Sequence, residues 1–162
     1  MNPAHPNSQT RQMGGVEKTD AVLALLRILA GVLFIVSGFS KLMQPYQNFM
    51  AVVDSYDLLN RSETLLFAQA VPWVEYFGGL FLFLGLWTRE SLVLLWVLNS
   101  AFIVALSSAL WRKLPIQDCG CFGKAATLSP KQTLALDTAL WVVFVVLWAL
   151  RRGACALGLD RR

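Results

Sequence analysis

The sequence predicts an all-α fold, an integral membrane four-helix bundle. Of the 162 residues, 56% are hydrophobic and only 15% are charged, whereas an ordinary soluble domain carries about a quarter charged residues. A chain this short cannot hide so much apolar surface in a water-soluble core. Four apolar segments have the length that a helix needs to cross a bilayer core, which is about 20 residues. Helices satisfy their own backbone hydrogen bonds, so four spanning helices are the simplest solution.

The first three predicted spans cover residues 21–43, 65–87 and 91–111. The third is the clearest, because it contains no charged residue. Tryptophans 87, 111 and 148 lie at segment ends, where their amphipathic rings favour the membrane interface. These positions support the predicted boundaries.

The fourth predicted span needs its first turn to reach the required length. Its apolar part covers only residues 134–150. Before it, Ser129 can act as N-cap, Pro130 suits the first helical position, and Gln132 completes a capping box. We therefore predict that the fourth span covers residues 130–150.

One domain is expected, formed by the four spans within residues 20–152. Residues 1–19 are polar and irregular in composition and lack a signal-peptide pattern, so we expect a disordered cytoplasmic tail before a retained first helix. Residues 153–162 form a basic C-terminal tail. The net charge of +4 comes from basic residues at segment ends and in tails, so no nucleic-acid partner is expected.

Lys and Arg favour the cytoplasmic side of a membrane. Their bias here is slight, but Arg151 and Arg152 directly follow the fourth span. We predict a multi-pass protein of the cell inner (plasma) membrane with both termini in the cytoplasm. The connection between the third and fourth spans would then be extracytoplasmic, and Cys155 would lie on the other side as a bystander.

That connection contains the most informative stretch, Asp-Cys-Gly-Cys-Phe-Gly at residues 118–123. A disulfide between Cys119 and Cys121 would close a three-residue loop, which stabilises a fold by only about 1.6 kcal/mol before strain is subtracted. A strained, exposed disulfide instead exchanges readily with other thiols. Gly120 fits this interpretation because a residue without Cβ lets the backbone bend sharply. We therefore assign Cys119 and Cys121 as the candidate catalytic pair.

Two other interpretations of the pair stay open. It could be structural or adventitious, or it could bind a soft metal such as Cu(I), which favours thiolates. Further metal ligands are scarce, because His5 is the only histidine and lies on the presumed opposite side. We therefore assign no metal site.

Ionisable and polar residues within the spans form a second candidate site. Charges inside a membrane are costly and by default mark function or a buried pair. Glu75 lies near mid-span, and Arg27 could reach toward it, whereas Lys41 could snorkel to the interface. With Asn99 and Asp137, these residues could fix helix register or form a proton or quinone site. Gly31 and Gly38, like Gly78 and Gly85, are seven residues apart, a spacing that favours close helix packing.

Three stretches resemble the MauE methylamine-utilisation group within the DoxX-like superfamily of four-helix membrane proteins. They read R-x3-G-x2-F-x2-SG-x2-KL at residues 27–42, P-x2-E-x2-GGL-x4-G at residues 72–85, and DCGCFG at residues 118–123. The likeness spans roughly residues 20–150. The helix motifs are loose, and the cysteine motif in that place is more specific.

The resemblance implies a redox-associated membrane protein. MauE-like proteins are linked to maturation of the disulfide-rich small subunit of methylamine dehydrogenase, beside a periplasmic thioredoxin-like partner. Related DoxX-like proteins are linked to quinone-coupled chemistry. No dinucleotide, P-loop or haem-attachment motif is present, so a soluble partner or a membrane quinone would supply the redox equivalents.

We therefore expect a thiol–disulfide oxidoreductase that exchanges disulfides with an extracytoplasmic thioredoxin-like partner or folding client, with quinone as a candidate cofactor near Glu75. The first rival is a non-enzymatic assembly factor or membrane anchor for such a maturation system. The second is a small metal or solute transporter, which would need a homo-oligomer.

Overall fold

The computed structural model describes residues 9–56, 58–112 and 129–150, with side chains from residue 19 onward. These residues form five helices and no strand: α1 (Gln9–Leu42), α2 (Tyr46–Ser55), α3 (Arg61–Leu84), α4 (Thr88–Trp111) and α5 (Pro130–Ala149). Four of them, all except α2, are long and apolar enough to cross a membrane. The predicted all-α fold with four candidate spans is therefore confirmed.

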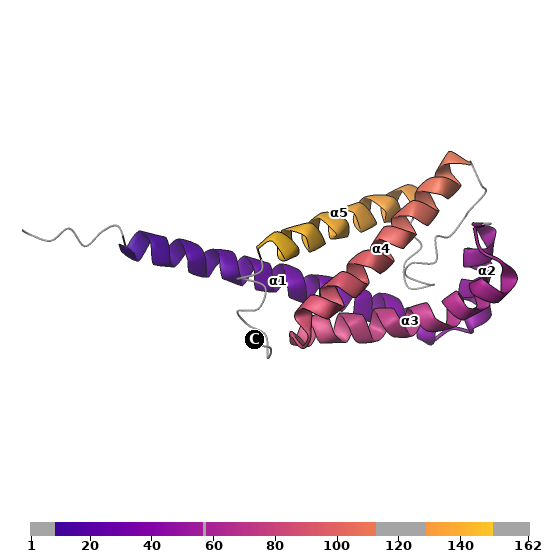
Figure 1. Cartoon of the computed structure of the whole chain (residues 1–162), viewed down its shortest axis with the longest axis horizontal. Helices are drawn as coiled ribbons and strands as arrows, with labels where there is room; N and C mark the ends of the chain where they lie inside the picture. Colours follow the sequence, from indigo (N-terminus) through magenta and orange to yellow (C-terminus); the bar gives the residue numbers. More distant parts are fainter. Residues whose placement is uncertain (1–8, 57, 113–128, 151–162) are drawn as a thin grey trace, which may run out of the picture.

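The four long helices alternate in direction along the bundle (Figure 1). The short helix α2 lies at the end where α1 finishes and α3 begins, and α4 finishes and α5 begins at this same end. We call it the α2 end, and the other the opposite end. α1 extends beyond its neighbours at the opposite end, where α5 also finishes.

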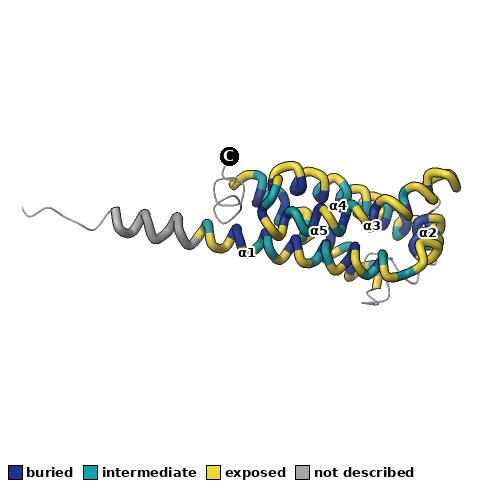
Figure 2. The backbone as a smooth tube through the Cα atoms, turned by 90° about the horizontal axis from the view of Figure 1, so that it is seen from below, coloured by how far each residue is buried: buried dark blue, intermediate teal, exposed yellow. Residues whose placement is uncertain are grey.

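Buried residues face the interior of the bundle and exposed ones its outer surface, as Figure 2 shows. The largest core cluster includes Leu82, Leu95 and Phe144, which have no exposed surface. Large apolar side chains such as Leu66 and Val104 are about two-thirds exposed. An outer surface of this kind suits lipid, in which apolar side chains gain nothing by burial.

The predicted start of α5 is confirmed in detail. Ser129 Oγ accepts a hydrogen bond from the backbone N–H of Gln132 (3.4 Å), and Gln132 Oε1 accepts one from the N–H of Ser129 (3.1 Å). Pro130 takes the first helical position. Side chains thus satisfy two backbone N–H donors at the start of the helix, those of Ser129 and Gln132.

A similar capping interaction was missed at the start of α3. Glu63 Oε2 accepts a hydrogen bond from the N–H of Asn60 (3.1 Å), so the helix begins at Arg61 rather than at the predicted residue 65. At its other end, Gly85 adopts a left-handed conformation with φ 69°. Gly85 N–H donates to Leu82 O and Leu86 N–H to Phe81 O, which is the Schellman pattern.

The expectation of a disordered tail through residue 19 is wrong for its second half, because α1 already begins at Gln9. A helix that has been nucleated grows by one hydrogen bond for each residue that it orders. The tail residues next to the span are mostly good helix formers. They extend α1 despite the cost of a Gly-Gly pair at residues 14–15.

Helix α2 was not predicted either. It is amphipathic, with Phe49 and Val53 buried in a cluster with apolar residues of α3 and α4. After it, Tyr56 is buried beside Leu106 of α4, and its carbonyl oxygen accepts a hydrogen bond from Arg112. α2 therefore packs across the ends of the spanning helices at the α2 end.

Helices α1 and α3 approach each other closely through glycines. A Cβ atom added to Gly31 would lie 3.0 Å from Gly79 O, and one added to Gly38 would lie 2.6 Å from Tyr76 N. The packing role of Gly31 and Gly38 is confirmed. Gly78 and Gly85 do not form a second contact of this kind. Gly78 faces the side chain of Leu95 in α4, and Gly85 ends α3.

Candidate functional site

The structure brings Lys41 of α1 and Glu75 of α3 together as a buried ion pair. Lys41 Nζ lies 2.6 Å from both carboxylate oxygens of Glu75, and both side chains are 2% exposed. Ser37 Oγ donates to Glu75 Oε2 (3.0 Å) and accepts from Lys41 Nζ (3.2 Å). The carboxylate therefore has charge-assisted hydrogen bonds, the strongest kind that side chains form.

Two aromatic rings complete the surroundings of the ammonium group. Lys41 Nζ lies 4.9 Å from the ring centre of Phe49 in α2 and 5.1 Å from that of Phe102 in α4. A cation this close to a ring face is attracted by the ring's electrons, most strongly where water is excluded. Lys41 thus links α1 to three other helices at one point.

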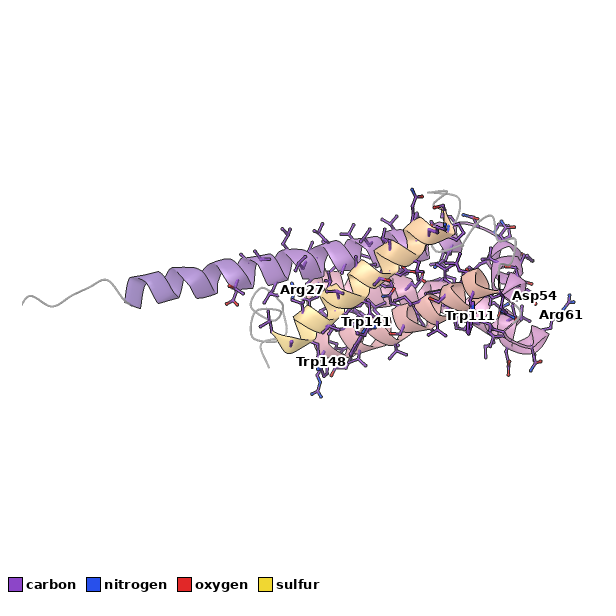
Figure 3. All side chains as sticks on the ribbon, turned by 90° about the horizontal axis from the view of Figure 1, so that it is seen from above. Arg27, Asp54, Arg61, Trp111, Trp141 and Trp148 are labelled. Carbon is purple, nitrogen blue, oxygen red and sulfur yellow. The ribbon has the colours of Figure 1, made fainter. Side chains whose placement is uncertain are left out.

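This geometry corrects two expectations. Lys41 does not snorkel to the interface, because its side chain turns inward to a carboxylate that a bilayer interior would otherwise leave uncompensated. Glu75 meets Lys41 rather than Arg27, which lies ten residues before Ser37 on α1, a distance of about 15 Å along a helix. Figure 3 places Arg27 and Trp148 toward the opposite end of the bundle, away from Trp111 and Asp54.

Asn99 and Asp137 connect the other two spanning helices. Asn99 Nδ2 donates a hydrogen bond to the backbone carbonyl of Asp137 (2.9 Å), and both side chains are buried. This bond joins α4 to α5. Both residues also line a small cavity together with Ser37 and Glu75, so four of the five predicted intramembrane site residues lie at, or next to, one place.

A larger groove opens beside Lys41 at the α2 end. Its volume is about 450 Å³, which is within the range of roughly 300–1,000 Å³ that small-molecule sites occupy. Three aromatic side chains and two amides contribute to its lining, namely Tyr46, Phe49, Trp73, Gln44 and Gln69. Such a lining suits a planar headgroup with polar atoms.

Cys119, Cys121 and Cys155 lie outside the residues that the structure describes. The cysteine pair belongs to the segment between α4 and α5, and the structure describes both of these helices: α4 ends and α5 begins at the α2 end. The groove beside Lys41 opens at this same end of the bundle.

Sequence reasoning missed three residues that shape the site. Ser37 bonds both members of the ion pair, and Phe49 and Phe102 flank the ammonium group. Ser37 lies one helical turn before Lys41, so an i, i+4 pattern of polar residues in an apolar span was a usable signal. The two phenylalanines carried no such signal, because they look like ordinary apolar residues of the helices.

Comparisons with known proteins agree with this architecture. A family model described as methylamine utilisation protein MauE matches residues 19–151, which include all four spanning helices. Searches of curated proteins and of solved structures find no significant match. The family match covers most of the chain, and it includes the helices that carry the buried ion pair. This multi-pass membrane protein therefore belongs to the MauE family of methylamine utilisation proteins.

Proposed function

We propose that this protein exchanges disulfides, through Cys119 and Cys121, with an extracytoplasmic thioredoxin-like protein or a disulfide-containing client, as an accessory to methylamine utilisation. The observation that carries the proposal is a Cys-Gly-Cys pair in a chain of this family. Its two flanking helices end at the same side of a membrane bundle, so a soluble partner on that side could reach the thiols.

The exchange proceeds in two balanced steps. A thiolate of one protein attacks a sulfur of the other protein's disulfide, a mixed disulfide forms, and the displaced sulfur leaves as a thiolate. The second thiolate of the attacking protein then breaks the mixed disulfide. One dithiol is oxidised and one disulfide is reduced, and no electrons are left over.

A quinone is a fitting electron acceptor or donor for the pair. The groove beside Lys41 combines rings with amide side chains, and its lining therefore fits a planar ring that carries two carbonyl oxygens. When bound, a quinone supplies a two-electron, two-proton couple. Gln44 and Gln69 would orient the ring through hydrogen bonds, and Tyr46 and Trp73 would hold its faces.

Single cysteine variants are expected to trap the partner. Cys119→Ser or Cys121→Ser leaves one thiol without its resolving neighbour, so one of the two variants should accumulate a mixed disulfide. The complex is detected on non-reducing gels of acid-quenched membranes and identified by mass spectrometry. The Cys155→Ser variant is the matched control and should trap nothing.

Absence of a mixed disulfide from both single variants would overturn the proposed exchange. For the Cys119→Ala/Cys121→Ala variant, the exchange proposal predicts loss of function. The assembly-factor alternative predicts that function is kept, because an anchor does not need the thiols. Methylamine-dependent growth or maturation of a disulfide-rich client distinguishes the two.

The proposed topology predicts the accessibility of each thiol. In intact cells, a membrane-impermeant maleimide should label single-cysteine variants that retain Cys119 or Cys121, after reduction. The variant that retains only Cys155 should be labelled only after lysis, and it is thus an internal control. The reverse pattern would place the cysteine pair in the cytoplasm and exclude an extracytoplasmic partner.

A further inference from the structure

A second hollow lies on the outer surface of the bundle, next to the groove beside Lys41. Its volume is about 500 Å³. The lining is mostly apolar or aromatic and comes from the C-terminal end of α1, the residues just after it and α3, namely Ile35, Val36, Phe39, Ser40, Met43, Gln44 and Tyr76. We call this space the α1 hollow. Val36 and Phe39 are about half exposed, so the hollow opens toward the lipid that surrounds a spanning helix.

The α1 hollow is continuous with the groove beside Lys41. Gln44 lines both spaces. A row of rings also joins them, because Trp73 of the groove stacks on Phe77 with ring centres 5.9 Å apart, and Phe77 contacts Tyr76 of the hollow at 5.5 Å. The two spaces therefore form one elongated site that runs from the α2 end along the spanning part of α1.

The polarity of this site changes along its length. The groove combines rings with amide side chains. In the α1 hollow, by contrast, polar groups are bound to the helix backbone: Ser40 Oγ donates to Ser37 O (2.8 Å), and Gln44 Nε2 donates to Ser40 O (3.2 Å). The hollow follows α1 from Ile35 to Met43, a length of about 12 Å. Such a site fits a hydrocarbon chain that is attached to a polar ring.

The charge of the groove restricts the kind of head group that it accepts. Among the described residues that line the groove, Lys41 alone is charged. Both carboxylate oxygens of Glu75 already lie 2.6 Å from its ammonium group. The phosphate of a lipid headgroup would therefore meet no uncompensated positive charge there. An uncharged ring suits the groove better.

We propose that the α1 hollow binds the isoprenoid tail of a quinone whose ring lies in the groove beside Lys41. The inference rests on the quinone proposed above and names its class, a long-tailed membrane quinone that enters from the bilayer. Lipid is as apolar as the hollow, so the tail gains little affinity from burial. Its contacts with Phe39 and Tyr76, whose ring centres lie 6.4 Å apart, position the ring instead.

The test is photo-crosslinking of the protein in liposomes with two probes made from one isoprenoid benzoquinone. One probe carries a diazirine at the end of the tail, and the other carries it on the ring. Mass spectrometry should find the tail label on residues 35–43 and the ring label on residues that line the groove. A ring label in the groove with a tail label elsewhere would overturn this inference alone. A ring label that misses the groove would overturn the quinone proposal as well.

Filling the α1 hollow provides the decisive comparison. Val36→Trp should abolish the tail label on residues 35–43 and leave the ring label in the groove. Val32→Trp, one turn earlier on the exposed side of α1 and outside the lining, is the matched control and should leave both labels in place. Met43→Trp is a second filling variant in case Val36→Trp fails to fold. A tail label that persists in the folded filling variants would contradict the inference.

A phospholipid with a diazirine on its acyl chain measures the competing occupant. The tailed quinone should displace this lipid label from residues 35–43, whereas the same quinone ring without a tail should not. A lipid label that the tailed quinone leaves unchanged would assign the hollow to an acyl chain and overturn the inference.

Discussion

Replacing Lys41 by methionine is expected to lower the free energy of unfolding by roughly 3–5 kcal/mol, the usual cost of removing one partner of a buried ion pair. The loss leaves the carboxylate of Glu75, 2% exposed, without its compensating charge. The hydrogen bond from Ser37 cannot replace a full positive charge. Reversible unfolding in mixed detergent micelles, followed by circular dichroism, measures the change.

Two control variants separate the ion pair from the volume of the side chain. The double variant Lys41→Met/Glu75→Leu removes both charges and should recover most of the lost stability, because well-packed apolar residues often replace a buried pair without net cost. Lys131→Met removes an exposed lysine and should change stability by no more than about 0.5 kcal/mol. A double variant as unstable as Lys41→Met alone would mean that the charges do not act as a pair.

Adding one methyl group to Gly38 is expected to cost roughly 1–3 kcal/mol, the typical penalty of overpacking. The new Cβ atom would lie 2.6 Å from Tyr76 N and 2.8 Å from Pro72 O. These are backbone atoms, so α1 and α3 would have to move apart to admit it. The Gly38→Ala variant is compared with wild type in the same unfolding experiment.

Gly78→Ala is the matched variant on the other side of α3. Its Cβ atom would lie 2.9 Å from Leu95 Cδ2, the end of a side chain that can rotate away. The substitution also removes the conformational cost of glycine in a helix, about 1 kcal/mol relative to alanine. We therefore expect little or no loss of stability. Equal losses in both variants would contradict the close backbone contact between α1 and α3.

The spans were predictable because length and apolarity are properties of the local sequence. The start of α5 was predictable as well, since Ser129 and Gln132 satisfy backbone groups within the same turn. α2 was missed because its ten residues are far fewer than a span requires. A closer look at Phe49, Val53 and Tyr56, spaced four and three residues apart, would have indicated a helix with one apolar face.

The site was only partly predictable. Glu75 stood out because a carboxylate in an apolar span needs a partner. Its partner was misassigned, because the rotation of α1 against α3 depends on glycine contacts between helices that the separate patterns do not specify. Because Lys41 is near a helix end, its position was typical of an interface anchor. The rotation of α1 about its own axis, which faces Lys41 toward α3, is what directs the side chain inward. The groove beside Lys41 depends on α2 and so could not be foreseen.

The ion pair also has a consequence for biosynthesis. Lys41 and Glu75 are 34 residues apart in the chain, so a growing polypeptide delivers α1 to the bilayer before the carboxylate of α3 exists. Before α3 is made, the side chain of Lys41 can reach the lipid headgroups, because it lies close to the end of its helix. Glu75 lies in the middle of α3, so its shorter side chain cannot reach the headgroups. Docking on α1 supplies the counter-charge to Glu75 and so favours the lateral release of α3 into lipid, which couples the membrane insertion of α3 to its assembly with α1.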